Sequence, residues 1–291
     1  MREVRFTKGH GTGNDFILIE DHSGQLRLSE SEIARLCDRH FGIGADGLIF
    51  VTETKNHEEV SALLEDEPSA RWFMDYRNAD GSRAEMCGNG ARVFARYLID
   101  KALVRAEDGK TIPIATRGGI RDLTPAAVGF AVDLGEFRID RTQDVEVSAL
   151  GLTIPRPSLA VSVGNPHQVV AVADESELRQ LDLTTAPRFS PKLPNGANVE
   201  FVVPKGLEQG VGLISMRVHE RGVGETLSCG TGIAAAAIAV REWGAPAQNY
   251  WRVEVPGGSV GVRIWPSENG ERVSISGPAE LVYEGAIAVR D

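Results

Sequence analysis

The segment "LSCGTGIAAAAIAV", residues 227–240, places Cys229 before a Gly-Thr-Gly turn and eight small or aliphatic residues that carry no charge. A helix that is apolar on every face is buried on every face. The segment therefore predicts a buried helix, ended by Gly244 and Pro246, with Cys229 at its N-terminus. Taken alone, this cysteine could be a buried structural thiol, half of a disulfide, a metal ligand, or a reactive nucleophile or base.

A second copy of this pattern lies upstream, where Cys87 opens the segment "CGNGARVFARYL". Asn78 and Glu220 occupy matching places, because each lies nine residues before its cysteine. The segments "GNDFIL" (13–18) and "GNPHQV" (164–169) also repeat a Gly-Asn turn that leads into a strand. An internal repeat of this kind predicts two similar domains that face each other across a cleft, each contributing one cysteine.

Most of the remaining sequence predicts β-strands. Short runs rich in valine and isoleucine alternate with turn residues, as in "GFAVDLGEF" (129–137), "NVEFVVP" (198–204) and "GLISMRVHERG" (212–222). The segment "WRVEVPGGSVGVRIW" (251–265) predicts a β-hairpin. The expected fold class is therefore mixed α/β with many strands and few helices, and 291 residues suffice for two domains.

The composition narrows the class of partner. A formal net charge of −10 argues against a general nucleic-acid or anionic-membrane surface and favours a small-molecule substrate. Residues 1–15 lack the apolar core of a signal peptide, and no apolar run approaches the roughly 20 residues that span a bilayer. The sequence therefore predicts a cytoplasmic protein.

The three cysteines, at positions 37, 87 and 229, are too few and too scattered to indicate a disulfide-stapled domain. None of them forms the C-x-x-C spacing of a zinc site, so no metal is expected. Cys37 falls within a short amphipathic helix that Ser29 opens with a capping box and that ends near Gly42. Its apolar neighbours indicate a buried structural thiol.

The other two cysteines are placed for proton transfer. A helix N-terminus offers backbone N–H groups without intrahelical acceptors and the positive end of the helix dipole, which together favour thiolate over thiol. We therefore expect the pKa of both thiols to fall. The same N–H groups can hold a substrate carboxylate. Two thiols on opposite sides of an α-carbon could then invert its configuration, and since no pyridoxal-phosphate motif is recognisable, the expected route uses no cofactor.

Seven ordered motifs cover nearly the whole chain: "KGHGTGNDF", "GIGADG", "DYRNADGS", "MCGNGARVFARYL", "GNPH", "NVEF" and "MRVHERGVGETLSCGTG". Together they resemble the diaminopimelate epimerase family, cofactor-independent enzymes that interconvert LL- and meso-diaminopimelate in bacterial lysine and peptidoglycan precursor synthesis. The resemblance implies a homodimer of chains with two pseudo-symmetric domains, each a mixed β-barrel-like sheet around a central helix, with the active site in the cleft between them. The expected domains are residues 1–126 completed by 278–291, and residues 127–277.

The resemblance also implies roles for residues at matching positions. Cys87 and Cys229 would be the acid/base pair, with Cys229 accepting the proton in the LL direction and Cys87 donating one. The reacting carboxylate would bind backbone N–H groups of Gly88, Asn89, Gly230 and Thr231. The far end of the substrate would be read by Asn14, Asn78, Asn165, Asn198 and Arg221, with Arg221 holding the second carboxylate. His167 and Glu220 would tune the thiols, and Glu220 would also line the substrate site.

One position departs from the family pattern, because many relatives carry a glutamine where this chain has Gly47, so that a direct side-chain contact is lost. The charged segment 53–71 predicts a solvated insertion or a surface helix. The hypothesis of a Cys87–Cys229 disulfide in the absence of substrate stays open, as does a zinc site that uses His167.

Two other functions share the fold that the resemblance implies. A proline-racemase-type epimerase would act on another amino acid, and a phenazine-biosynthesis-type isomerase would not epimerise. Arg221 favours a substrate with a second carboxylate, and the presence of both cysteines argues against the isomerase.

Overall fold

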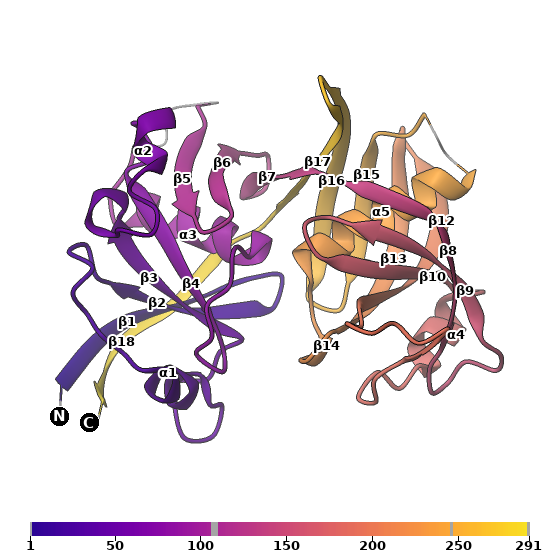
Figure 1. Ribbon diagram of the computed structural model, residues 1–291, viewed down its shortest axis with the longest axis horizontal. Helices are drawn as coiled ribbons and strands as arrows, with labels where there is room; N and C mark the ends of the chain where they lie inside the picture. The colour runs from indigo at the N-terminus through magenta and orange to yellow at the C-terminus, as the bar shows by residue number, and fades with distance from the viewer. Residues whose placement is uncertain (1, 106–109, 245–246, 290–291) are drawn as a thin grey trace. The chain divides into compact units, whose positions relative to one another are not determined.

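Each half of the chain arranges its strands around one buried helix (Figure 1). The computed structural model describes residues 2–105, 110–244 and 247–289. It divides the chain into unit 1, Met1–Val132 with Gly277–Asp291, and unit 2, Asp133–Ser276. The assignment of these units as two epimerase domains stays a prediction.

Unit 1 is built on a sheet with the spatial order β18, β1, β2, β3, β4, β5, β6 and β7. The pairs β2–β3 and β4–β5 are parallel, and the other neighbours are antiparallel. Its elements are β1 (Arg2–Gly11), β2 (Asn14–Glu20), α1 (Glu30–Cys37), β3 (Gly47–Glu53), η1 (Thr54–Asn56), α2 (Leu63–Asp66), β4 (Trp72–Asn78), α3 (Gly88–Asp100), β5 (Ile112–Thr116), β6 (Gly119–Pro125), β7 (Phe130–Glu136) and β18 (Glu280–Val289).

Unit 2 follows with a sheet in the order β11, β8, β9, β10, β12, β13, β15, β16 and β17. The short strand β14 pairs with β13. The elements are β8 (Arg138–Ser148), β9 (Arg156–Ser162), β10 (Pro166–Ala171), α4 (Glu175–Gln180), β11 (Arg188–Ser190), β12 (Asn198–Glu208), β13 (Val211–Glu220), β14 (Gly224–Thr226), α5 (Gly230–Gly244), β15 (Tyr250–Val255), β16 (Gly258–Ser267) and β17 (Gly270–Gly277). The predicted hairpin at 251–265 is confirmed as β15 and β16.

The two sheets repeat one pattern of strand directions. From β1 to β6 the successive pairs are antiparallel, parallel, antiparallel, parallel and antiparallel. The series β9, β10, β12, β13, β15 and β16 has the same pattern. The repeat seen around the two cysteines in the sequence is therefore a repeat of whole units.

The predicted central helices are confirmed. In unit 1, strands β1–β4, β6 and β18 contact α3, which buries Val93, Phe94, Tyr97 and Leu98. In unit 2, strands β9, β10, β12, β13, β15 and β16 contact α5. The four consecutive alanines 234–237 are fully buried, and their small side chains let strands approach the helix closely. The mixed α/β fold around central helices is thus what the sequence predicts.

The helix α1 begins as predicted but ends earlier. Ser29 accepts a hydrogen bond from the backbone N–H of Glu32, whose carboxylate accepts one from the backbone of Ser29, so the capping box is confirmed. The helix ends at Cys37, not near Gly42, because the Asp38 side chain accepts hydrogen bonds from the next backbone N–H groups and stops the helix. Cys37 is buried in the core, and burial raises its pKa to about 12.

Candidate active site

Cys87 is the N-cap of α3. Its Sγ accepts a hydrogen bond from the backbone N–H of Gly90 at 3.4 Å, and its carbonyl accepts one from Ala91 at 2.8 Å. The thiol is partly buried. The backbone N–H groups of Gly88 and Asn89 belong to the first turn, where a helix provides no intrahelical acceptor and where an anion is favoured.

Two asparagines stand beside this thiol. The Cys87 sulfur lies 3.7 Å from Asn14 Oδ1, and Asn89 Nδ2 donates to the same oxygen at 3.2 Å. The amide of Asn14 is fixed in turn, because its Nδ2 donates to Asp46 at 2.8 Å. The structure therefore brings three predicted site residues of unit 1, Cys87, Asn14 and Asn89, into one hydrogen-bonded group.

Asn78 is held separately, at the end of β4. Its Nδ2 donates to Ser82 Oγ at 3.0 Å, and its backbone N–H and carbonyl bind Ser82 and Gly81 in a tight turn. This turn leads towards Cys87 along the chain. Asn78 is thus fixed in orientation. Its hydrogen bonds to Ser82 and Gly81 do not connect it to the group formed by Cys87, Asn14 and Asn89.

Cys229 has the same backbone geometry in unit 2. Its carbonyl accepts a hydrogen bond from Ile233 at 2.9 Å, its sulfur accepts one from the Gly232 N–H, and Thr231 Oγ1 lies 3.7 Å from the sulfur. Gly230 and Thr231 occupy the first turn of α5, as Gly88 and Asn89 do in α3.

The electrostatic surroundings of Cys229 differ from the sequence expectation. Burial raises its pKa well above the ordinary value, and the carboxylates of Glu220 and Glu200 raise it further. Hydrogen bonds from Gly232 and Thr231 act in the opposite direction but are outweighed. The expected fall in pKa is therefore wrong for Cys229, because burial and two carboxylates overcome the helix N-terminus.

The strongest polar contact beneath α5 joins His167 and Glu200. His167 Nδ1 lies 2.8 Å from Glu200 Oε1, and His167 Nε2 lies 2.9 Å from Asn165 Oδ1. Both His167 and Glu200 are buried, and a Cβ on Gly232 would lie only 2.6 Å from Glu200 Oε1. The pair therefore lies directly under the first turn of the Cys229 helix.

Glu200 is a residue that sequence reasoning missed. We expected His167 and Glu220 to tune the thiols, whereas the structure places Glu200 against His167 and both carboxylates near Cys229. The signal was present in "NVEF", where one carboxylate interrupts a strand of otherwise apolar residues. A buried carboxyl group requires a hydrogen-bond partner, and Glu200, which is fully buried, has His167 as its partner.

Asn198 and Arg221 are joined through the backbone. The Arg221 N–H donates to Asn198 Oδ1 at 2.9 Å, and the Arg221 guanidinium donates to the carbonyl of Asn195 at 3.0 Å. Arg221 is exposed, so its remaining donors face solvent. Glu220 accepts a hydrogen bond from Thr226 Oγ1 and thereby links the end of β13 to β14. Unit 2 thus holds Asn165 with His167 and Asn198 with Arg221.

The position of Gly47 explains the departure from the family pattern. A Cβ on Gly47 would lie 2.5 Å from Tyr76 Cε2 and 3.1 Å from its hydroxyl oxygen. Tyr76 is buried and packs edge-on against Phe16. The tyrosine ring therefore occupies the space that a glutamine side chain at position 47 would need.

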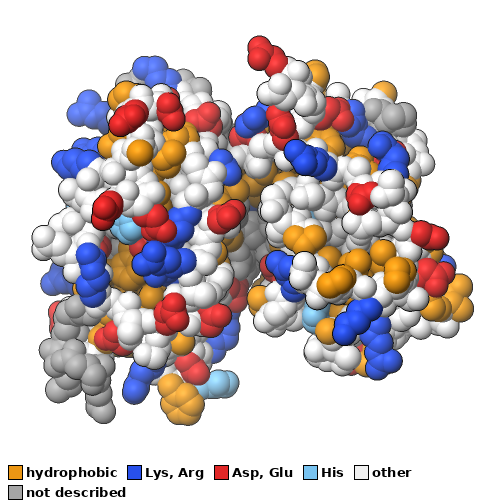
Figure 2. Space-filling model, in the orientation of Figure 1, with side chains coloured by type: hydrophobic (Ala, Val, Ile, Leu, Met, Phe, Trp, Pro, Cys, Tyr) orange, Lys and Arg blue, Asp and Glu red, His pale blue; other side chains and the backbone are white. Residues whose placement is uncertain are grey.

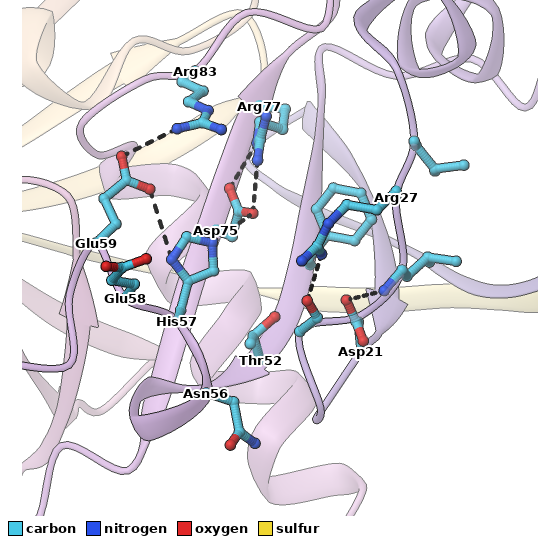
Figure 3. A pocket seen from close by; sticks show the side chains of 14 residues that line it. Asp21, Arg27, Thr52, Asn56, His57, Glu58, Glu59, Asp75, Arg77 and Arg83 are labelled. Atoms are coloured by element: carbon cyan, nitrogen blue, oxygen red, sulfur yellow. Dashed lines mark hydrogen bonds and ion pairs between the residues drawn. The ribbon is translucent and has the colours of Figure 1, made fainter.

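A separate cavity of about 650 Å³ lies on unit 1 (Figure 3). Its wall includes 56–59 of the charged segment, and Val60 from that segment packs with Phe73 and Ala115, so the segment is more than a solvated insertion. Some of the charges in the wall are paired, since Asp75 binds Arg77 and Glu59 lies 3.5 Å from Arg83. Basic and acidic side chains are also interspersed over the face shown in Figure 2.

In the described parts of the chain, no group of three or more His, Cys, Asp and Glu side chains is placed to hold a metal ion. The helices described there are also too short or too polar to span a membrane.

Comparison with known proteins places this chain among epimerases. A family model described as diaminopimelate epimerase matches residues 6–139 and 159–282. Proteins named diaminopimelate epimerase from Streptomyces coelicolor and Thermobifida fusca are each 42% identical to it. The alignments cover 97% of this chain and 94% of the first relative, and 98% of both chains for the second.

Solved structures share the fold at low identity. A phenazine biosynthesis protein of the PhzF family from Bacillus anthracis superposes with a TM-score of 0.72 at 15% identity, over 99% of this chain and 100% of the other. A hydroxyproline epimerase from Agrobacterium vitis superposes with a TM-score of 0.66 at 10% identity, over 100% and 94%. These similarities show the two-unit epimerase fold and no particular activity.

Proposed function

As the chain belongs to the diaminopimelate epimerase family, it is an epimerase, and we propose that it interconverts LL- and meso-2,6-diaminopimelate. The resemblance carried by the sequence motifs is confirmed at the level of the family. The reaction supplies an intermediate of lysine and peptidoglycan precursor synthesis.

In the proposed reaction, two thiols act on opposite faces of one α-carbon. In the LL direction the Cys229 thiolate takes the α-proton, so that the C–H bond breaks and an S–H bond forms. The electron pair left on carbon is delocalised into the carboxylate. The Cys87 thiol then gives its proton to the other face, and a C–H bond of inverted configuration forms. No cofactor takes part in this route.

The difficult step is the formation of the carbanion, because an amino-acid α-proton is a very weak acid. Donors that are already oriented toward the developing charge stabilise it most effectively. We assign this role to four backbone N–H groups in the first turns of α3 and α5, those of Gly88, Asn89, Gly230 and Thr231. The positive ends of the two helices add to the same effect.

The far end of the substrate carries a second amino group and a second carboxylate. Arg221 suits this carboxylate because its guanidinium is exposed while Asn198 fixes its backbone. Asn14, Asn78 and Asn165 are the proposed partners of the remaining polar groups, and Glu220 lines the same site. Three of these asparagines are already held by hydrogen bonds to Asp46, Ser82 and His167.

One observation supports this proposal above all others: the two cysteines have the same geometry. Each sulfur accepts from the N–H three residues ahead, and each carbonyl accepts from the N–H four residues ahead. Each cysteine also opens the central helix of its unit. A structural thiol in only one unit would not require this repetition.

The test is exchange of the α-proton in deuterium oxide with LL-diaminopimelate as the substrate. The parent enzyme should incorporate deuterium as it epimerises, and Cys87→Ser and Cys229→Ser should each lose at least about 10²-fold in rate, the usual contribution of a general acid or base. Cys37→Ala is the matched control, since this buried thiol lies in the α1 core, and it should keep its activity. Full activity in either Cys87→Ser or Cys229→Ser would disprove the two-base mechanism.

We also propose that the enzyme is a cytoplasmic homodimer. A reducing compartment suits a mechanism that requires reduced thiols, and Cys37, Cys87 and Cys229 are not joined in disulfides. On β18, Val282 and Tyr283 expose 56% and 47% of their surface, which offers apolar area to a second copy. Sedimentation velocity should give the dimer mass at micromolar concentration, and a monomer mass throughout that range would contradict the dimer.

A further inference from the structure

Arg92 is a buried cation on the helix that Cys87 opens. It lies five residues after Cys87, and none of its surface is exposed. Its Nη2 donates to Thr12 Oγ1 at 3.2 Å, while Nε and Nη1 have no hydrogen-bond partner among the described residues. A Cβ on Gly11 would lie 3.1 Å from Arg92 Nη2 and 3.2 Å from the carbonyl oxygen of Asn89. The guanidinium therefore points back toward the first turn of α3.

A buried guanidinium almost always has a carboxylate partner, because desolvation of an unpaired charge is very costly. Arg92 has no such partner among the residues that the structure describes. Burial lowers its pKa to about 10, and the group whose charge opposes that fall is Cys87. Arg92 thus remains protonated at neutral pH, and the sulfur of Cys87 is the anion available to it.

Six carboxylates on the strands and turns around α3 are engaged with other groups. Asp15 and Asp46 both bind Arg39, and Lys8 also binds Asp15. Glu20 binds Tyr97, and Asp75 binds Arg77. Glu280 lies 3.9 Å from His10, and Glu284 binds Lys101. None of these carboxylates has a hydrogen bond to the Arg92 guanidinium.

Unit 2 has the opposite arrangement. The residue five places after Cys229 is Ala234, which carries no charge and is fully buried. The charges that act on Cys229 are the carboxylates of Glu220 and Glu200. A cation accompanies one thiol, and two anions accompany the other.

We propose that Arg92 is a positioning residue that holds the Cys87 sulfur in its thiolate form, so that the free enzyme rests with Cys87 ionised and Cys229 protonated. The inference rests on the proposed role of Cys87 as an acid/base residue. The resting enzyme is then ready to take a proton at Cys87, which is the meso-to-LL direction. The LL direction requires the proton to be on Cys87 and the charge on Cys229.

The test is the pH profile of Cys87 alkylation by iodoacetamide in the full chain, without substrate. Peptide mass spectrometry reports Cys87 separately from Cys37 and Cys229. Because thiolate is the reactive form, Arg92→Met should move the midpoint of the profile upward by about one pH unit, which lowers the alkylation rate about tenfold at a pH below both midpoints. Arg92→Lys keeps a cation and should stay closer to the parent.

Arg96→Met is the matched control. Arg96 lies on the same helix, with its side chain 39% exposed and 3.6 Å from Asp100, so its loss should leave the midpoint unchanged. If Arg92→Met does not fold, as judged by circular dichroism, Arg92→Gln removes the charge and keeps a donor for Thr12. An unchanged midpoint in a folded Arg92→Met or Arg92→Gln variant would overturn the inference. Since alkylation needs no substrate, this failure is distinguishable from failure of the exchange experiment.

Discussion

The side chains that pack beneath the first turns of α3 and α5, which we call the floors of the two cysteine helices, differ although the backbones of the two helices match. A Cβ on Gly90 in α3 would lie 3.4 Å from both Phe16 and Ile49, whereas one on Gly232 in α5 would lie 2.6 Å from the carboxylate of Glu200. The strand registers make these positions equivalent. Phe16 pairs with Gly47 as His167 pairs with Asn198, and Leu18 pairs with Ile49 as Val169 pairs with Glu200. The floor is therefore apolar in unit 1 and contains a hydrogen-bonded histidine and carboxylate in unit 2.

This difference shows how one fold can present two thiols in different states. The backbone supplies the same N-cap geometry to both, because strand order and helix start are repeated. Side chains under and behind each helix then set the local charge. Unit 1 combines an apolar floor with the buried Arg92, and unit 2 combines the His167–Glu200 pair with Ala234. A two-base reaction requires one ionised and one protonated thiol at any moment, so this asymmetry serves the proposed chemistry.

The largest effect should come from copying the floor of unit 1 into unit 2. His167→Phe alone leaves the buried side chain of Glu200 without this hydrogen-bond partner, and we expect a loss of about 3 kcal/mol in the free energy of unfolding. The double variant His167→Phe with Glu200→Ile removes both polar side chains and should recover most of that loss. Urea unfolding of the parent, both single variants and the double variant measures the coupling energy.

The control for this cycle is the equivalent position in unit 1, where Ile49→Leu changes packing without changing polarity. Its cost should be no more than about 1.5 kcal/mol, the usual range for a volume-conserving apolar change. If the two single variants in unit 2 were additive, the His167–Glu200 pair would not act as a unit, and the contrast between the two floors would lose its energetic meaning.

The contrast also defines what the sequence can and cannot predict. The spacing of Asn78 and Glu220 from their cysteines, together with the turn motifs, predicts the repeat and the central helices. The local rule that a helix N-terminus lowers a thiol pKa fails at Cys229, because burial and Glu200 act through tertiary contacts. Strand register brings Glu200 under α5, and a motif of four residues does not contain that information. Arg92 was missed for the same reason, since only the packed structure shows that no carboxylate of the described residues pairs with it.

A smaller effect should follow acidification of the turn that carries Asn14. Burial by itself would raise the pKa of Asp15, but hydrogen bonds and charges from Arg39 and Lys8 outweigh burial and lower it to about 2. Since the folded pKa is below the unfolded value near 3.9, the contribution of Asp15 to stability is complete above about pH 4 and is lost as the pH falls through about 2. The shift corresponds to about 2 kcal/mol.

Unit 2 has no carboxylate at the position equivalent to Asp15, and this pH dependence is therefore not expected there. Pro166 follows Asn165 as Asp15 follows Asn14. Urea unfolding of the parent between pH 5 and pH 2 should therefore show a steeper loss of stability than that of Asp15→Asn, and Pro166→Ala should keep the slope of the parent. Equal slopes in the parent and in Asp15→Asn would show that the network around Asp15 does not support the folded state.

The smallest effect should come from the residue two places after each cysteine, Asn89 in unit 1 and Thr231 in unit 2. Thr231 Oγ1 lies 3.7 Å from the sulfur of Cys229, and its hydrogen bond lowers the thiol pKa against the larger effects of burial and the carboxylates. Thr231→Val should therefore raise the midpoint of Cys229 alkylation by less than about one pH unit, since the contact is long. Thr231→Ser keeps the hydroxyl and should behave as the parent.

Both variants retain the backbone N–H that we assign to the substrate carboxylate. Their KM for diaminopimelate should therefore stay within about twofold of the parent value, a factor that corresponds to about 0.4 kcal/mol. A large rise in KM for Thr231→Val would instead place the hydroxyl, and not the backbone, on the carboxylate.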